Sequence, residues 1–402
     1  MRHLSYTTRK GFTLVELMVV IAIIGLLVAI LLPALSAARS TAQAAGSGSN
    51  LSGFGRGFMI NATEDKSSRL STGAFDHLRD GDCRKTGWVA DLLRLKSANP
   101  GKALDPSNPS QVNEKVADYI GAVNTSGKAN PVRWKGQTSN VHFGGANAPA
   151  DMNSGTATPD KRRKLWEDGF NSNYATTWHF SRGDCLTSGT PATVPANMNP
   201  VTTDPSKCPL DGDGPLSEKK LVGGTVSRDR IALMGASRNG DGNDALVTDA
   251  FFQTFETFFG TGQKIITAGA ILVESFTDGM TCPFEDTALG GSTGEKIHEI
   301  NDIVPIHGGR KTAVTDNGTT VNLSTGGYAQ VLFADGHVAK VNDEGGFQDN
   351  PDSWLGPYKA TPTALTSGSF TINASGFDEV RDSIWLGQIG NSGGGVGGGS
   401  VE

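Results

Sequence analysis

The chain has 402 residues, of which 19% are charged, 37% are hydrophobic and 53 are glycine. This length is enough for two or three structural units, and the composition indicates a polar, loop-rich globular protein. The formal net charge is −6 and the sequence has no basic stripe, which argues against a nucleic-acid partner.

The first predicted elements are a short leader and a long apolar helix. Residues 1–11 read MRHLSYTTRKG and are polar and basic, whereas Phe12–Leu35 is almost wholly apolar. About 20 apolar residues span a bilayer, and the basic flank should keep the N-terminus on the cytoplasmic side. Good helix formers follow, and Gly46 opens the string GSGSN. We therefore expect one helix that ends at Gly46, roughly 50 Å long.

This apolar segment differs from an ordinary secretory signal peptide in two ways. The basic residues stand directly before it with only Gly11 between, and no clean small-x-small cleavage site follows it, although Ala34, Ala37 and Ala38 offer an alternative. It also contains an acid, Glu16. A carboxylate inside a membrane span is expensive, so Glu16 is a candidate functional residue.

The string Gly11-Phe12-Thr13-Leu14-Val15-Glu16 resembles the signal shared by type IV prepilins and type II secretion pseudopilins. The resemblance covers about a tenth of the chain. It implies that a membrane prepilin peptidase cleaves after Gly11 and N-methylates Phe12. It also implies an assembly role for Glu16 and places Pro33 where many pilins have a helix-kinking proline.

Elementary physics agrees with that resemblance. Gly11 lets a protease approach the backbone closely. The amine freed at Phe12 is positive, and Glu16, one helical turn away in the same or a neighbouring subunit, can neutralise it in an apolar core. Pro33 has no amide hydrogen and can bend a helix. Removing residues 1–11 takes away three basic residues, so 35 − 3 = 32 basic and 41 acidic residues remain, a net charge of −9.

The unit 47–350 is predicted to be a globular head, and 351–402 a C-terminal segment that ends in a flexible glycine-rich tail. The head is rich in turn formers and has short strand-like stretches. The strands are expected at Arg230–Met234, Ile265–Phe276 and Tyr328–Phe333, and helices at Val112–Val123 and Asp249–Phe259. The five phenylalanines of the last helix form either a buried face or an exposed aromatic stripe.

The C-terminal part of the head carries a second resemblance. Ile306-His307-Gly308-Gly309 followed by Val331–Val338, which reads VLFADGHV, is similar to the H…DG ending of a group of pilin-like proteins (the DUF1559 group), as is the string 173–179. That group separates the His from the Asp-Gly by about nine residues, whereas 27 residues (308–334) lie between His307 and Asp335 here. This departure indicates an insertion, which we place at Thr312–Leu323.

The Asp335-Gly336 pair predicts a tight type I′ hairpin turn. His307 is expected to bond a strand carbonyl or the Asp335 carboxylate. The two residues then form either a structural contact or a catalytic His-Asp pair.

The four cysteines allow two disulfides in an exported protein, and buried thiols are the alternative. The expected pairings are Cys185–Cys208 and Cys83–Cys282. Acidic turns offer candidate calcium ligands, the best of them at Asn239, Asp241, Asn243 and Asp244, although turn chemistry alone explains such strings. No other cofactor is expected.

Metalloprotease and P-loop motifs are absent, and no enzymatic activity is expected. The sequence predicts an α+β protein with a long N-terminal helix and a head built on an antiparallel sheet. Its expected role is structural. The precursor is expected in the inner membrane with its head exported, and the mature subunit in a periplasmic pseudopilus or an extracellular filament. The expected partners are prepilin peptidase, other pilin or pseudopilin subunits and an inner-membrane assembly platform. A secretion pseudopilin and a filament-borne binding module stay open as alternatives.

Overall fold

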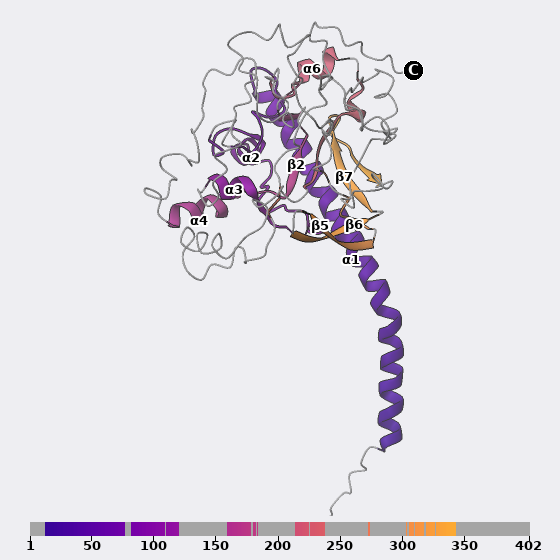
Figure 1. Cartoon of the computed structure of the whole chain (residues 1–402). Coiled ribbons are helices and arrows are strands. Elements are labelled where there is room, and N and C mark those ends of the chain that lie inside the picture. Colours follow the sequence, from indigo (N-terminus) through magenta and orange to yellow (C-terminus); the bar gives the residue numbers. More distant parts are fainter. Residues whose placement is uncertain are drawn as a thin grey trace, which may run out of the picture.

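The fold is described from a computed structural model. It describes residues 13–76, 82–108, 110–119, 159–177, 180–181, 183, 214–224, 226–237, 272–273, 303, 305–308, 310–316, 319–325 and 327–342. Within these residues a single long helix protrudes from a head that contains an antiparallel sheet (Figure 1). This arrangement confirms the predicted α+β fold class.

Helix α1, Leu14–Glu64, is one continuous helix of 51 residues that runs through Pro33. Its N-terminal half stands outside the head and its C-terminal half lies within it (Figure 1). The prediction that the helix ends at Gly46 is wrong, because the helix continues for another 18 residues (47–64) past that glycine. The predicted helical unit 12–46 is therefore only the first part of a longer element.

Tertiary packing explains why glycines do not end α1. The buried residues recur every three or four positions along its C-terminal half: Ala44, Ser47, Leu51, Phe54, Gly55, Gly57, Phe58, Asn61 and Ala62. A Cβ added at Gly55 would lie 2.9 Å from Leu332 Cδ1, and one at Gly57 would lie 2.3 Å from Leu92 Cδ2. Glycine costs a helix about 1 kcal/mol relative to alanine. Here it allows a close approach that the core requires.

The main sheet has four strands, β2 (Tyr174–Thr176), β3 (Ala232–Ala236), β7 (Tyr328–Phe333) and β8 (Val338–Asn342). They stand in the order β2-β3-β7-β8, and all neighbours are antiparallel. The bounds of β7 are those predicted, and β3 begins and ends two residues later than expected. α1 crosses one face of this sheet, where Gly48 lies beside Gln330 and Gly55 beside Leu332.

The turn between β7 and β8 is not the predicted type I′ turn. A type I′ turn needs positive φ at both central residues, and only Gly336 has one here, at +90°. The Gly336 N–H donates to Phe333 O at 2.9 Å, and the Phe333 N–H donates to His337 O at 2.9 Å. The loop therefore has three residues, Ala334 to Gly336, with glycine in the left-handed position, a common alternative to the two-residue turn.

Smaller elements surround this sheet. Two short sheets pair β1 (Val112–Asn113) in parallel with β4 (Leu272–Val273) and β5 (Arg310–Asp316) antiparallel with β6 (Thr319–Thr325). The remaining elements are α2 (Trp88–Arg94), α3 (Glu114–Tyr119), α4 (Pro159–Glu167), α6 (Glu218–Gly223) and the 3-10 helix η2 (Arg228–Arg230). The helix predicted at Val112–Val123 is thus a strand followed by a shorter helix within the described part of that range.

The core is aromatic where α1 meets α2 and the sheet. Phe54 of α1 contacts Tyr174 edge-on at 5.4 Å between ring centroids and lies 6.0 Å from Trp88. Phe58 packs 4.6 Å from Phe180. The opposite face of the sheet buries a second, smaller apolar cluster: Ala232, Ile303, Ala329, Val331, Phe333 and Val341. Both faces of the sheet are thus buried, one of them against α1.

Candidate functional site

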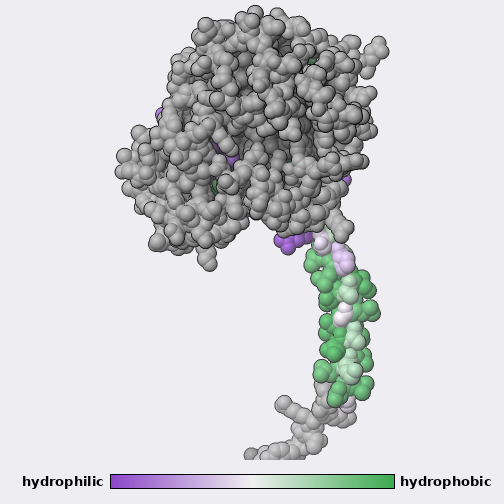
Figure 2. All heavy atoms as spheres, viewed as in Figure 1, coloured by the Kyte–Doolittle hydropathy of each residue, from purple (hydrophilic) through white to green (hydrophobic). Residues whose placement is uncertain are grey.

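The first candidate site is the half of α1 that stands outside the head. Every large apolar side chain from Leu14 to Leu35 is exposed, from 44% at Val28 to 76% at Leu14. Figure 2 shows this stretch as a hydrophobic rod below the head. A helix that is apolar on all sides needs an apolar environment all round, which a bilayer or a bundle of similar helices supplies.

α1 is also the one helix in the described part of the chain that is long and apolar enough to cross a membrane. The 22 residues between Glu16 and Arg39 include no charged residue. They span about 33 Å at 1.5 Å per residue, against about 30 Å for the hydrocarbon core. Length and composition therefore both fit a transmembrane segment.

Glu16 caps the start of α1. Its carboxylate oxygen Oε2 accepts hydrogen bonds from the backbone N–H and the hydroxyl of Thr13, each at 2.8 Å. In return the Thr13 hydroxyl oxygen accepts from the Glu16 N–H at 3.2 Å. This reciprocal pair is a capping box, which satisfies backbone donors that the first helical turn leaves open.

The capping box gives the Glu16 carboxylate partners that were not expected from the sequence. The sequence indicated the amine freed at Phe12 as the partner of this carboxylate, and the structure adds two hydrogen bonds from Thr13. The signal was present in the sequence, because Thr13 stands three residues before Glu16 at the start of an apolar run. Phe12 directly precedes Thr13, so an amine freed there would lie one residue from this cap.

A second candidate site is a buried polar cluster where α1 enters the head. Ser47 of α1 donates to Asp105 Oδ2 at 2.5 Å and lies 3.2 Å from the Tyr174 hydroxyl. The other oxygen of Asp105 accepts from the Ser107 N–H at 2.7 Å. The Asn173 Oδ1 accepts a hydrogen bond from the Asp105 N–H at 2.7 Å, and the Asn173 Nδ2 donates one to the Asp105 carbonyl at 3.0 Å. Two separate chain segments are thereby joined to the helix.

His307 completes this cluster. Its side chain is fully buried, its Nδ1 lies 3.1 Å from the Ser107 hydroxyl, and its Nε2 lies 3.2 Å from Asp105 Oδ2. The Nε2–Asp105 contact is close but is not aligned as a hydrogen bond. Burial, and secondly the charge of Asp105, raise the pKa of the Tyr174 hydroxyl, so it stays protonated.

The backbone and the ring of His307 have different partners. Its backbone exchanges hydrogen bonds with Tyr328 at the start of β7, and its ring meets Asp105 instead of the expected Asp335. Asp335 instead accepts from the His337 N–H at 3.0 Å and contacts the His337 ring at 2.5 Å. Of the two alternatives expected for His307, a strand carbonyl is met by its backbone N–H, which donates to Tyr328 O at 3.1 Å. The other alternative, a contact with Asp335, is wrong, because Asp335 lies in the turn at the far end of β7.

Serine, histidine and aspartate side chains meet here, but their geometry is not that of a hydrolase triad. Ser47 and His307 both approach the same carboxylate oxygen, Asp105 Oδ2, so the imidazole does not stand between the other two residues. Ser47, Asp105 and the His307 side chain are also fully buried. The arrangement ties chain segments together.

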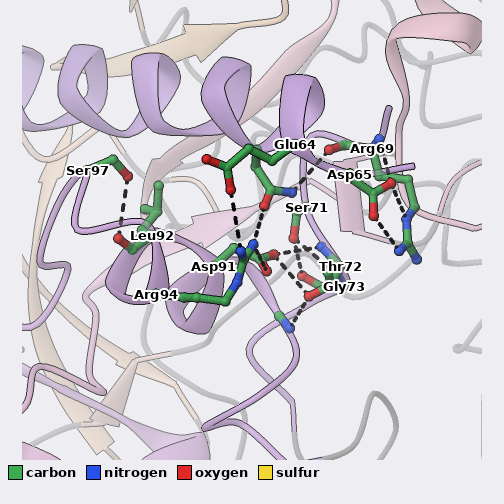
Figure 3. Close-up of polar contacts among 12 residues, drawn as sticks. Glu64, Asp65, Arg69, Ser71, Thr72, Gly73, Asp91, Leu92, Arg94 and Ser97 are labelled. Carbon is green, nitrogen blue, oxygen red and sulfur yellow. Dashed lines mark hydrogen bonds and ion pairs between the residues drawn. The ribbon is translucent and has the colours of Figure 1, made fainter. Parts of the chain in front are cut away.

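The other end of α1 is held by a second polar cluster (Figure 3). The Arg94 guanidinium donates to the Asn61 side-chain oxygen at 2.7 Å and lies 3.7 Å from Glu64. Asp65 accepts two hydrogen bonds from the Arg69 side chain, at 2.8 and 3.0 Å. That pairing lowers the pKa of Asp65 to about 2.

Asp91 is the buried acid of this second cluster. Its Oδ2 accepts from the Thr72 N–H at 2.7 Å and from the Thr72 hydroxyl at 3.0 Å. Its Oδ1 has no hydrogen-bond partner and lies 3.6 Å from the Arg94 guanidinium. Desolvation raises the pKa of the Asp91 carboxyl, and the Thr72 hydrogen bonds and Arg94 only partly oppose it.

Several predicted site residues lie outside the described residues. These are Gly11 and Phe12 at the cleavage junction, the cysteines Cys185, Cys208 and Cys282, and the candidate calcium ligands Asn239, Asp241, Asn243 and Asp244. Cys83 is described and buried. Both disulfide pairings stay predictions. No group of three or more potential metal-ligating His, Cys, Asp or Glu side chains occurs among the residues that the structure describes.

Comparison with known families gives one finding. Residues 7–32 match the model of the prokaryotic N-terminal methylation motif. The match covers the cleavage junction, Glu16 and most of the exposed half of α1, and it supports a prepilin-type protein of the type IV pilin-like family. Such a motif implies processing by a prepilin peptidase and assembly with other pilin subunits. No curated protein and no solved structure matches the chain.

Proposed function

We propose that this chain is a structural subunit that is cleaved after Gly11, N-methylated at Phe12 and assembled through α1 into a type IV pilus-like filament or a secretion pseudopilus. The observation that carries the proposal is the division of α1 into two halves. One half is apolar and exposed on all sides, and the other is built into the head. The methylation motif coincides with the exposed half.

The apolar half of α1 outside the head supports the assembly proposal, because its surface must be shielded from water. In the precursor the bilayer covers it. A subunit that leaves the bilayer loses this cover, and burying apolar surface is worth about 25 cal/mol per Å². Packing against the same half of neighbouring subunits restores the cover without unfolding the head. The chain then moves from membrane to filament by exchanging one apolar environment for another.

Cleavage supplies a charge that matches Glu16. Before cleavage, position 12 carries a neutral peptide group. After cleavage it carries an amine, one residue from the capping box of Thr13 and Glu16. N-methylation leaves that amine positive. The amine of one subunit and Glu16 of the same or an adjacent subunit can then form a neutral pair within the apolar bundle.

We also place the head in the group with the H…DG ending. His307 pairs with the first residue of β7, and the Asp335-Gly336 turn follows its last residue, so the two parts of the signature bracket one strand. This gives both parts a structural role. It supports the grouping even though the interval between them is longer than usual.

N-terminal analysis and microscopy test the proposal together. We expect intact-mass analysis of the membrane and filament fractions to find a chain that begins at N-methylated Phe12, and electron microscopy to show filaments built from it. Gly11→Glu should block cleavage, because a bulky charged side chain obstructs the scissile bond, while membrane insertion continues. A mature chain that begins beyond Ala38 would contradict the proposal. Cell-surface filaments would indicate a pilus, and short periplasmic assemblies that support protein secretion would indicate a pseudopilus.

A further inference from the structure

The β5–β6 hairpin occupies most of the extra length between His307 and Asp335. Its strands pair in continuous antiparallel register from Arg310–Thr325 to Asp316–Thr319. The expected insertion at Thr312–Leu323 is therefore an ordered hairpin in the structure. The extra segment thus adds a defined secondary-structure element to the head.

The hairpin starts at the level where α1 leaves the head. His307 and Tyr328 exchange backbone hydrogen bonds at 3.1 and 2.8 Å. The hairpin begins three residues after His307, at Arg310, and ends three residues before Tyr328, at Thr325. Gln330, two residues into β7, lies against Gly48 of α1. Figure 1 shows β5 and β6 at the base of the head, at the level where α1 emerges from it. The hairpin thus lies at the end of the head from which the exposed apolar half of the helix protrudes.

Within the described residues β5 and β6 pair only with each other. A two-stranded hairpin alone is marginally stable in water, and its outer edges carry unpaired backbone donors and acceptors. Such edges favour pairing with a further strand. The hairpin is therefore suited to gain a partner.

The outer edges differ in their protection. Natural edge strands commonly carry charged residues or proline that prevent pairing with other chains. β5 contains Arg310, Lys311 and Asp316, and β8, at the edge of the main sheet, contains Lys340. β6 reads TTVNLST and contains neither a charged residue nor proline. Of these three strands, β6 has the least protected edge.

We infer that β6 pairs, through its outer edge, with β5 of a neighbouring copy of this chain. The inference rests on the proposed function, in which copies pack side by side along α1 and so bring their head bases next to one another. Copies related by a screw axis meet through different surfaces, which favours β6 against β5 over β6 against itself. The two strands have equal length, seven residues each, so backbone pairing can run along both.

Site-specific photo-crosslinking tests this contact in full-length protein. A photoreactive amino acid replaces Asn322 in β6, and the control replaces Val222, which is exposed on α6. We expect covalent multimers from position 322 in filaments, with peptides joined to residues 310–316 of another copy, and none from position 222. Mixed isotope labelling separates crosslinks between copies from those within one chain. Crosslinks only to the same chain, to lipid or to another protein would overturn the inference.

A deletion variant gives a second measurement. Replacing residues 310–325 by a short Gly-Ser linker should leave cleavage and membrane accumulation unchanged. Filament yield should fall about tenfold or more. Normal filaments from the deletion variant would contradict the hairpin contact alone. A wild-type chain that is processed but forms no filament would instead contradict the proposed function.

Discussion

At the scale of single residues, Glu16 combines two properties that substitutions can separate. Its carboxylate caps α1 through Thr13, and in the proposed function its charge pairs with the amine that cleavage would free at Phe12. Glu16→Gln keeps an oxygen acceptor for the Thr13 N–H and removes the charge, whereas Glu16→Ala removes both. We expect both variants to be inserted and cleaved, since Gly11 and the scissile bond are untouched, and both to lose filaments. The measurement is filament yield beside the abundance of processed subunit.

The same pair of variants also separates assembly from helix capping. Removing the Glu16 side chain takes away the half of the capping box that satisfies the Thr13 N–H, so only Glu16→Ala should fray the first turn, which amide hydrogen exchange in membranes would detect. If Glu16→Gln assembles normally and Glu16→Ala does not, the cap is the important property and the charge-pair account of assembly is wrong.

Two acids near the end of α1 should give opposite pH dependence. Burial raises the pKa of Asp91, so its contribution to stability is fully present below the unfolded value near 3.8 and is lost as pH rises through the raised value. Asp91→Asn keeps an acceptor for Thr72 and has no charge to desolvate. We expect the melting temperature of this variant, relative to wild type, to be higher at pH 7 than at pH 3.

Asp65 is the matched control, because its pKa is shifted in the opposite direction. Its pKa is lowered to about 2, so its contribution is present above the unfolded value of 3.8 and is lost as pH falls toward 2. Asp65→Asn should therefore lower the melting temperature at pH 7 and have little effect near pH 2. If the two variants show the same pH trend, the assigned burial of Asp91 is incorrect.

At the scale of elements, the glycines of α1 provide a test of close packing. Gly57 stands against Leu92 and Ser97, whereas the nearest atom to a Cβ at Gly53 is the flexible Arg56 side chain at 3.9 Å. Gly57→Ala should destabilise the protein by about 1–3 kcal/mol through overpacking. Gly53→Ala should stabilise it by about 0.5–1 kcal/mol, because alanine is the better helix former. Chemical denaturation of the two variants in detergent measures the difference.

Much of the architecture was predictable from local sequence. The apolar run gave the exposed half of α1, and the string YAQVLF gave β7 with its bounds. The end of α1 was not predictable, because glycine propensity argued for a stop at Gly46 and contacts far away in sequence overrule it. The hairpin β5–β6 was missed although Asn317-Gly318, a strong hairpin signal, stands between its strands.

The candidate site was predictable to a similar extent. Thr13 and Glu16 are close in sequence, so their capping box could have been read from the spacing alone. The partner of His307 could not, because Asp105 and Ser47 lie 202 and 260 positions away along the chain (307 − 105 and 307 − 47). The acid offered from the sequence as one alternative, Asp335, is nearer along the chain, but the length of β7 places it at the opposite end of that strand.

At the scale of the whole molecule, the buried cluster at the base joins strands β7 and β8 to α1, the helix that in the proposed function connects the head to the membrane or the filament. Any pull on the exposed half of α1 reaches the head first at Gln43, whose side chain donates to Pro106 O at 3.1 Å, and then at Ala44 and Ser47, the first residues of the helix that are buried. Ser47 bonds Asp105, which contacts His307, which in turn pairs with β7. The head therefore resists extraction of α1 through links that are distant in sequence.

The two histidines of the signature region test this coupling. His307→Ala removes the contact with Ser107 and leaves Asp105 buried without the imidazole, which should destabilise the head by about 1–3 kcal/mol. His337→Ala removes an exposed contact with Asp335 and should cost about 0–1 kcal/mol. Limited proteolysis of full-length protein should cut β7 and β8 faster in the His307 variant than in the His337 variant. Equal protection in the two variants would show that the cluster at the base does not hold the C-terminal strands on α1.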